Sequence, residues 1–347
     1  MVESNSTSFT TNLTKKIDLN HSQRSFSKMA FDYADINLIP KMCVVGSRSE
    51  CDTRVRFGPR QFNLPVVPAN MQCVINDEIA IKLAENGFFY IHHRFDVNAP
   101  DFVRKMKMHN LYSSISLGVN GEAYDILQEL INHNLIPDYI TIDVAHGHSI
   151  AMKNIITYIH QRFPTTFIIA GNVSTPEATR DLESWGANAI KVGIGPGSAC
   201  TTYNATGFGS RGAQAYVVSQ CADATELPAT QIIADGGIST HGDITKSLVL
   251  GAHMVMIGGM FSSLTDSPGA VVNVDGQLFK EFWGSASSFQ SNKKNRIEGT
   301  KKLLPMKPHS MLDEMQSIKE GLQSAISYGG GSTLDCFQSV KYFVKHK

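Results

Sequence analysis

The sequence predicts an α/β fold, a single (β/α)₈ TIM barrel, because short apolar runs alternate with amphipathic segments along most of the chain. The runs are rich in Val and Ile without strict polar alternation, which is typical of strands buried on both faces of a parallel sheet. A doubly wound sheet would leave two of the strands without a natural place. The eight runs are residues 64–71, 88–93, 113–119, 139–148, 167–173, 189–195, 231–237 and 254–259.

Helical patterns lie between these runs. Residues 77–86, DEIAIKLAEN, are amphipathic and follow the first run. In the segment TPEATRDLESWG, Thr175 suits the N-cap, Pro176 the first turn and Gly186 the end of a helix. A final helical pattern, residues 311–328, would return the chain to the body of the barrel.

Two segments are longer than this repeat requires. One follows the sixth strand and contains Cys200, and the other, residues 265–310, follows the eighth strand. Within the second segment, NVDGQLFKEF predicts a hairpin that turns at Asp275-Gly276, and the polar, lysine-rich SFQSNKKNRIEGTKK comes after it. Long barrel loops usually build or cover the site, so we expect an active-site loop and a flap here.

Composition argues against several classes of protein. The 347 residues carry 31 Lys and Arg against 31 Asp and Glu, so nothing suggests a partner that is a nucleic acid or a membrane surface. Six scattered cysteines without a Cys-x-x-Cys pair favour a reducing, cytoplasmic location, and no apolar run is long enough to cross a bilayer. Residues 1–28, rich in Ser, Thr and Asn, are predicted to be a disordered extension, with a targeting segment as the alternative. Residues 29–347 are predicted to form one catalytic domain.

The motif that carries most chemistry is KVGIGPGSACTT. A cysteine is most often an inert packing residue. Here the thiol of Cys200 follows a turn built on Gly195, Pro196 and Gly197, at the polar end of the sixth strand. Backbone amides of such a turn could stabilise a thiolate, and its carbonyls could bind a monovalent cation. We therefore interpret Cys200 as a nucleophile and the other five cysteines as packing residues.

Two glycine pairs predict a phosphate site. Gly236 and Gly237 end the seventh strand, and Gly258 and Gly259 end the eighth, where barrels commonly hold a phosphate through bare backbone amides. The carboxylate of Asp235 beside them could accept hydrogen bonds from both hydroxyls of a ribose. Together these residues favour a nucleoside monophosphate as the ligand.

Two other motifs are weaker. Gly207, Gly209 and Gly212 have the Gly-x-Gly-x-x-Gly spacing, but no buried strand precedes them, so we reject a dinucleotide-binding fingerprint. The histidines of IDVAHGH and IHHR could take part in a metal site, yet no further acid or histidine completes a ligand set. A metal-dependent hydrolase is therefore disfavoured.

Taken together, the motifs GIGPGSACTT, IAGNV, ADGGI and MVMIGGMF resemble, in order and spacing, the IMP dehydrogenase/GMP reductase family of (β/α)₈ barrels. The resemblance extends from residues 31–40 to residues 327–335. Within the family, SRSECDT, VPANMQ, DVAHGHS, GSAS and a K-N-x-x-E-G stretch near 294–299 are most similar to the bacterial reductases. The family's dehydrogenases usually carry two regulatory CBS modules after the second strand, and residues 91–119 leave no room for them.

The resemblance implies reductive deamination, in which GMP and NADPH give IMP, ammonia and NADP⁺. Cys200 would attack C2 of the purine, ammonia would leave, and hydride would then reduce the covalent thioimidate. Thr202 and Glu298 would form the acid–base relay that protonates the leaving amine.

Further roles follow from the resemblance alone. They include a potassium ion as a second cofactor and a homotetramer as the assembly. Ser198, Gly237, Gly258 and Gly259 would bind the phosphate, Asp235 the ribose, and Ser285 to Ser287 the base. Asp143 and Asn172 would lie where the purine meets the nicotinamide. Main-chain carbonyls near Gly193, Gly195 and Cys200 would bind potassium.

Two positions depart from the bacterial pattern. Thr300 stands where a lysine usually follows Glu298-Gly299, and GSRGAQ (209–214) replaces the usual GTGGWQ. We expect both differences to alter the affinity for the cofactor more than the type of reaction.

An IMP dehydrogenase without CBS modules is the alternative activity, although the chain lacks the Arg-Tyr dipeptide with which such enzymes activate water. A catalytically inactive nucleotide-binding barrel is the third interpretation, although the cysteine, threonine and glutamate of the relay are all present.

Overall fold

The computed structural model describes residues 30–287, 289 and 298–345. The extension predicted over residues 1–28 lies outside the described residues. The chain divides into two units, Met1–Ala30 and Phe31–Lys347, and all elements named below belong to the second.

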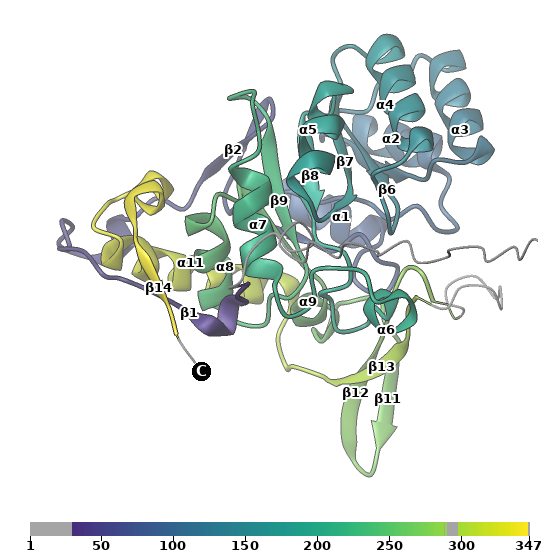
Figure 1. Cartoon of the computed structure of the whole chain (residues 1–347). Helices are drawn as coiled ribbons and strands as arrows, with labels where there is room; N and C mark the ends of the chain where they lie inside the picture. The colour runs from purple at the N-terminus through teal and green to yellow at the C-terminus, as the bar shows by residue number, and fades with distance from the viewer. Residues whose placement is uncertain (1–29, 288, 290–297, 346–347) are drawn as a thin grey trace, which may run out of the picture. The chain divides into compact units, whose positions relative to one another are not determined.

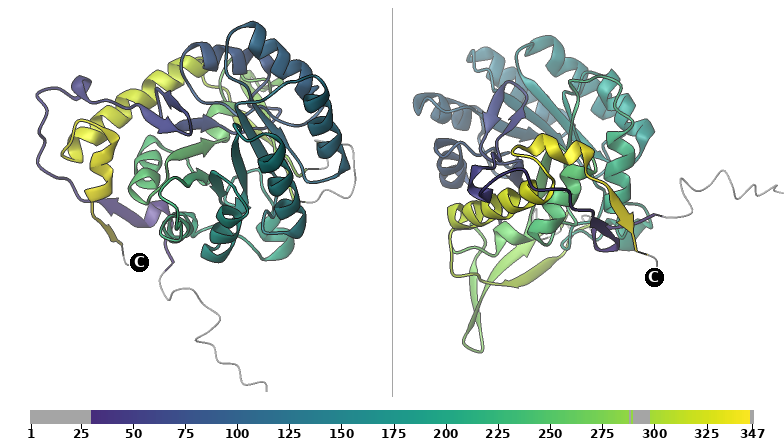
Figure 2. Two further views of the ribbon diagram at one scale, coloured as in Figure 1. Left: turned by 90° about the horizontal axis from the view of Figure 1, so that it is seen from above. Right: turned by 90° about the vertical axis from the view of Figure 1, so that its left-hand side faces the viewer.

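A curled, seven-stranded parallel sheet forms the centre of this unit (Figures 1 and 2). Its strands are short and almost entirely buried, as the continuous apolar runs predicted. In spatial order they are β4 (Val66–Pro68), β10 (Met254–Ile257), β9 (Gln231–Asp235), β8 (Ala189–Val192), β7 (Phe167–Val173), β6 (Tyr139–Asp143) and β5 (Ser114–Leu117).

Helices connect these strands and lie around the outside of the curled sheet (Figure 2). The predicted start of α5 is confirmed, because the side chain of Thr175 accepts a hydrogen bond from Ala178 N and Pro176 opens the helix. The final helix has the predicted bounds. The longer helices are α1 (Asp77–Glu85), α2 (Ala99–Met108), α3 (Gly121–Asn132), α4 (Ile150–Arg162), α5 (Pro176–Ser184), α7 (Gln214–Ala222), α8 (His241–Val249) and α11 (Met311–Tyr328).

The predicted second strand, residues 88–93, is not a strand in the structure. The segment is buried, and His92 N donates to Ser114 O of β5 at 3.1 Å, but no ladder joins it to β4 in the part of the chain that is described. The hydroxyl of Ser116 donates to the carbonyl oxygen of His92, so a side chain takes an acceptor that a strand ladder would use. The described sheet therefore ends at β4 and β5.

The hairpin predicted after the eighth run is confirmed. Strands β11 (Val271–Val274) and β12 (Gln277–Trp283) pair in antiparallel fashion, and β13 (Lys301–Pro305) pairs with the other edge of β12. Asp275 and Gly276 form the turn with φ angles of 51° and 85°, the left-handed conformation of a tight hairpin turn. We call this three-stranded sheet, with residues 284–287 and 298–300 between β12 and β13, the flap (Figure 1).

Aromatic side chains fill the end of the sheet where the strands begin. Phe57, in the hairpin of β2 (Val55–Phe57) and β3 (Arg60–Phe62), lies 5.2 Å from Phe167 and 6.3 Å from Tyr139 between ring centroids. This packing closes one end of the sheet and leaves the carboxyl ends of the strands for a site. The remaining short elements are β1 (Ile36–Leu38), β14 (Tyr342–Val344), α6 (Thr202–Thr206), α9 (Gly259–Ser262), η2 (Tyr33–Asp35), η3 (Arg48–Glu50) and η4 (Leu334–Ser339).

None of the helices within the described ranges has the length and apolar character needed to span a membrane.

Candidate active site

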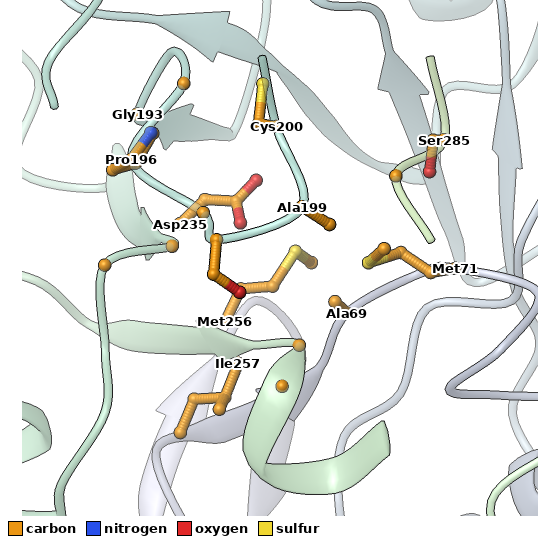
Figure 3. A pocket seen from close by; sticks show the side chains of 18 of the residues that line it. Ala69, Met71, Gly193, Pro196, Ala199, Cys200, Asp235, Met256, Ile257 and Ser285 are labelled. Atoms are coloured by element: carbon orange, nitrogen blue, oxygen red, sulfur yellow. The ribbon is translucent and has the colours of Figure 1, made fainter. Parts of the chain in front are cut away.

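A cavity of about 1020 Å³ opens at the carboxyl ends of the strands and is bordered by the flap (Figure 3). Its lining brings together every site residue that the sequence predicted except Ser287. That serine is buried and forms a β-bridge with Gly299 in the flap. The predicted residues on the lining are Asp143, Asn172, Gly193, Gly195, Ser198, Cys200, Thr202, Asp235, Gly237, Gly258, Gly259, Ser285 and Glu298.

Cys200 lies on a tight turn after β8. Its amide donates to Gly197 O at 3.0 Å, and Gly195 takes a left-handed φ of 76°, so the chain reverses within a few residues. The thiol is partly exposed to the cavity, and its sulfur lies 3.2 Å from Oγ1 of Thr202 at the start of α6. Cys221 and Cys73, by contrast, are buried, and burial raises the pKa of each thiol to about 11. Cys200 is therefore better placed than these two to act as a nucleophile.

The flap brings a carboxylate to this turn. Thr202 Oγ1 donates to Oε2 of Glu298 at 2.7 Å, so thiol, hydroxyl and carboxylate lie in one chain of contacts. Backbone bonds fix the approach, since Thr201 N donates to Glu298 O at 2.9 Å and Thr300 N donates to Ala199 O at 2.9 Å. The arrangement can pass a proton between a group bound at the sulfur and Glu298.

A buried lysine is part of the cavity lining. Lys191, in β8, places Nζ 2.6 Å from Oδ1 of Asp143 and 3.2 Å from Oδ2 of Asp235, and its side chain is 2% exposed. Burial acts to lower the pKa of Lys191, but attraction to the two carboxylates outweighs burial and raises it. Burial likewise acts to raise the pKa of Asp143, and Lys191 and Arg94 hold it below its usual value. Lys191 and Asp143 are therefore both charged at neutral pH.

Two buried polar atoms of residues that line the cavity have no hydrogen-bond partner among the described residues. They are Oδ1 of Asn172 and Nε of Arg94. The other end of the Asn172 amide is held, because Nδ2 donates to Gly193 O and to Oδ2 of Asp235, each at 2.7 Å. A buried polar atom without a hydrogen-bond partner lowers the stability of the fold, so these atoms suggest that a polar ligand binds here.

The loops after β9 and β10 form the end of the cavity where a phosphate was predicted. Gly236 has a φ of 85°, and a Cβ there would lie 3.1 Å from Cγ of Pro196 and 3.2 Å from Gly197 N, so the close approach of the loop after β9 to the loop after β8 needs glycine. Across the cavity, α9 begins at Gly259. Bare amides at the start of a short helix after the eighth strand are the common phosphate site of barrels.

Two of the four histidines considered for a metal site, His92 and His148, each contact a nearby carboxylate. His148 Nε2 is 2.7 Å from Asp181 Oδ2, and His92 Nε2 is 3.0 Å from Asp77 Oδ1. Over the described ranges, no group of three or more His, Cys, Asp or Glu side chains could hold a metal ion.

Sequence reasoning assigned no role to Lys191, Asn70 or Arg94. A signal existed for Lys191, since a charged residue inside an otherwise apolar strand has to find a buried partner. Asn70 lies at the end of the first predicted strand and Arg94 directly follows the second, but their sequence neighbours do not show which side chains reach the cavity.

The fold and the site define a TIM-like α/β enzyme with a cysteine at the carboxyl ends of its parallel strands. A family model described as "IMP dehydrogenase / GMP reductase domain" matches residues 30–347, and the chain belongs to this family. Proteins named GMP reductase are close relatives over most of the chain. The one from Bacillus licheniformis is 52% identical over 315 residues, which are 90% of this chain and 95% of the relative. The one from Bacillus subtilis is 51% identical over 90% of this chain and 95% of its own length. The one from Mesoplasma florum is 51% identical over 91% of this chain and 98% of its own length.

Proposed function

We propose that this chain reduces GMP to IMP and ammonia with NADPH, a step in the interconversion of purine nucleotides. Relatives that are about half identical over nine-tenths of the chain carry the name GMP reductase, which supports this activity. The observation that carries the proposal is the chain of contacts from Cys200 through Thr202 to Glu298.

The contacts suit a covalent route through a thioimidate. Cys200 Sγ bonds to C2 of the purine, and the C2–N2 bond then breaks and releases ammonia. Thr202 and Glu298 supply the proton that the leaving amine requires. NADPH, when bound, supplies the hydride that reduces C2, after which the C2–S bond breaks and IMP leaves.

Residues around the cavity hold the substrate in this proposal. The glycine loops and Ser198 bind the phosphate, and Asp235 accepts from the ribose hydroxyls. Ser285 and Ser287 contact the base from the flap, with Ser285 lying across the cavity from Asp235 (Figure 3). Ser287 does not line the cavity, so its contact depends on how the flap meets the bound base.

The residues also fit a nicotinamide cofactor. The unpartnered Oδ1 of Asn172 suits the amide hydrogens of a carboxamide, and Asp143 borders the same side of the cavity. A potassium ion would be held by carbonyls near Gly193, Gly195 and Cys200. It would share the Gly193 oxygen with the amide of Asn172.

The wider organisation extends the proposal. We propose that residues 88–93 take the eighth position of a closed barrel, that the loop after β8 and the flap complete its site, and that residues 29–347 form one catalytic domain. Residues 1–28 would be a separate disordered extension. The enzyme would be a cytoplasmic homotetramer that binds neither nucleic acid nor membrane.

Cofactor oxidation tests the activity. Absorbance of the reduced nicotinamide should fall when the enzyme receives GMP and NADPH, and IMP and ammonia should accumulate in equal amounts. Cys200→Ala should abolish turnover while GMP still binds, because the phosphate and ribose contacts lie elsewhere. Cys221→Ala, a buried cysteine distant from the cavity lining, is the matched control. Formation of xanthosine monophosphate from IMP and NAD⁺, without GMP-dependent oxidation, would instead identify an IMP dehydrogenase. Binding of GMP without either reaction would identify an inactive barrel.

A further inference from the structure

Three cationic side chains line the described part of the cavity, and two of them lie at its Asp143 side. Lys191 is paired with Asp143 and Asp235, and Arg94 acts on the charge of Asp143. The third is Lys307, which follows β13. Its amide donates to Ser263 O at 2.8 Å, which ties it to the residue directly after the one-turn helix α9. Lys307 is therefore the cation of this lining that lies beside the glycine loops.

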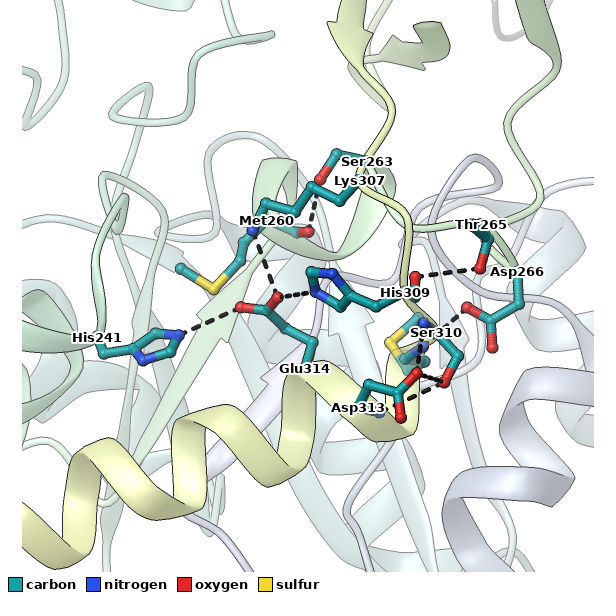
Figure 4. Close-up of polar contacts among 11 residues, drawn as sticks. His241, Met260, Ser263, Thr265, Asp266, Lys307, His309, Ser310, Asp313 and Glu314 are labelled. Atoms are coloured by element: carbon teal, nitrogen blue, oxygen red, sulfur yellow. Dashed lines mark hydrogen bonds and ion pairs between the residues drawn. The ribbon is translucent and has the colours of Figure 1, made fainter. Parts of the chain in front are cut away.

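A buried carboxylate holds this lysine. Glu314, in the first turn of α11, has a side chain that is 4% exposed, and its Oε2 lies 3.3 Å from Nζ of Lys307. The same carboxylate contacts Nε2 of His309 at 2.6 Å and Nε2 of His241 at 3.2 Å (Figure 4). Burial acts to raise the pKa of Glu314, but its hydrogen bonds to the two histidines and the charge of Lys307 outweigh burial and lower it.

This cluster has basic groups in excess. The charge of Lys307 is enough to balance the single carboxylate of Glu314, and two imidazoles contact the same carboxylate. An ammonium has three donors, of which Glu314 takes one, so donors remain for an anion in the cavity. His241 begins α8, directly after the loop that contains Gly237 and Ser239, so the cluster also connects the phosphate loop to Lys307.

We propose that Lys307, positioned by Glu314, binds the phosphate monoester of the substrate at the α9 end of the cavity. The backbone amides of the glycine loops donate oriented hydrogen bonds to the phosphate but carry no net charge. Lys307 supplies the positive charge that pairs with a phosphate dianion. This inference rests on the proposed function, because it takes the nucleotide to be GMP. A phosphate monoester also occurs in the ribose 2′-phosphate of NADPH, so the test separates the two sources.

Equilibrium binding of GMP and of guanosine tests the substrate arm. Lys307→Met should weaken GMP binding by about ten- to a hundredfold, the loss expected for one charge-assisted hydrogen bond. Guanosine binding should change less than about twofold, within the scatter of a surface substitution. In steady-state assays, the KM for GMP should rise by a larger factor than the turnover number falls. Lys307→Arg, which keeps the charge, should retain most of the GMP affinity and guards against misfolding of the methionine variant.

Lys82→Met is the matched control. Lys82 forms an ion pair with Asp266 at 2.9 Å, is 39% exposed against 41% for Lys307, and does not line the cavity. It should alter neither GMP nor guanosine binding. Equal losses for GMP and guanosine in Lys307→Met would show a structural role and overturn the proposal. A raised KM for NADPH but not NADH, with GMP binding intact, would assign Lys307 to the cofactor phosphate and overturn it as well.

Glu314→Gln tests the positioning role. In the otherwise unchanged protein, this variant should weaken the binding of GMP more than that of guanosine, because the Lys307 ammonium loses the carboxylate that holds it. In protein that already carries Lys307→Met, it should cause no further change in that ratio, and additive losses would refute the coupling. If the unaltered enzyme binds neither GMP nor guanosine, the proposed function itself fails, which is distinguishable from every outcome above.

Discussion

Replacing Lys191 by methionine should destabilise the fold severely. Methionine nearly matches the length of lysine but carries no charge, so Asp143 and Asp235 would lose a counter-ion that lies 2.6 Å and 3.2 Å from them. Removing one partner of a buried ion pair costs about 3–5 kcal/mol, because the other charge stays buried without compensation. Natural domains have only about 5–15 kcal/mol of stability in total. The variant should therefore unfold at a much lower urea concentration.

The pH dependence of this loss follows from the pKa of Asp143. In the unaltered protein that pKa is lowered, so the pair contributes stability above the ordinary value of 3.8, and the contribution is lost as pH falls through the folded value. In Lys191→Met, burial dominates and the pKa should rise above 3.8. The variant would then lose stability as pH increases through that raised value. The difference in unfolding free energy between the two proteins should grow from about pH 4 to pH 7.

Urea unfolding followed by circular dichroism measures this difference. Lys107→Met, at an exposed position of α2, is the control, and it should change stability by less than about 0.5 kcal/mol. A loss below about 1 kcal/mol in Lys191→Met, or a loss equal at both ends of the pH range, would refute the reasoning from the buried charge.

Two further predictions concern other groups. Glu298→Gln should slow GMP reduction about 10²–10⁴-fold more than NADPH formation from IMP and NADP⁺, because only deamination needs its proton. Equal losses in single-turnover assays of both directions would mean that Glu298 only holds the flap. Burial lowers the pKa of His93 to about 3 from 6.5, so the neutral imidazole stabilises the fold above pH 6.5, and this contribution is lost as pH falls. At about pH 5 the loss should be about 2 kcal/mol, and His93→Phe should remove it from the pH profile of urea unfolding.

The sequence predicted those parts of the fold that depend on burial and local geometry. Apolar runs mark strands because both faces of the parallel sheet exclude water, and the Asp275-Gly276 turn fixes the flap hairpin locally. Burial does not by itself decide hydrogen bonding, however. Phe89, Tyr90 and Ile91 are all fully buried, yet their segment forms no strand, since side chains take part of its backbone bonding.

The site divides in the same way. Cys200 and Asp235 could be predicted because Asp235 ends β9 and Cys200 lies on the glycine-rich turn after β8, both at the polar edge of the sheet. Glu298 lies 96 residues after Thr202 and reaches it only because the flap folds back, which no local pattern encodes. Its role came from family resemblance. The importance of Lys191 depends on two carboxylates at the ends of β6 and β9, so it became visible only with the spatial order β9-β8-β7-β6.

In the proposed mechanism, the position of Glu298 couples proton transfer to the docking of the flap. Its carboxylate reaches Thr202 while its own carbonyl and the amide of Thr300 bond to the cysteine loop. Gly299, between them, bridges both Cys200 and Ser287, and a Cβ there would lie 2.7 Å from Ser287 N, so the approach is tight. The acid–base group is thus present at the sulfur only when these backbone bonds are made. Any change that loosens the bonds should slow deamination even though Cys200 and its turn are unaltered.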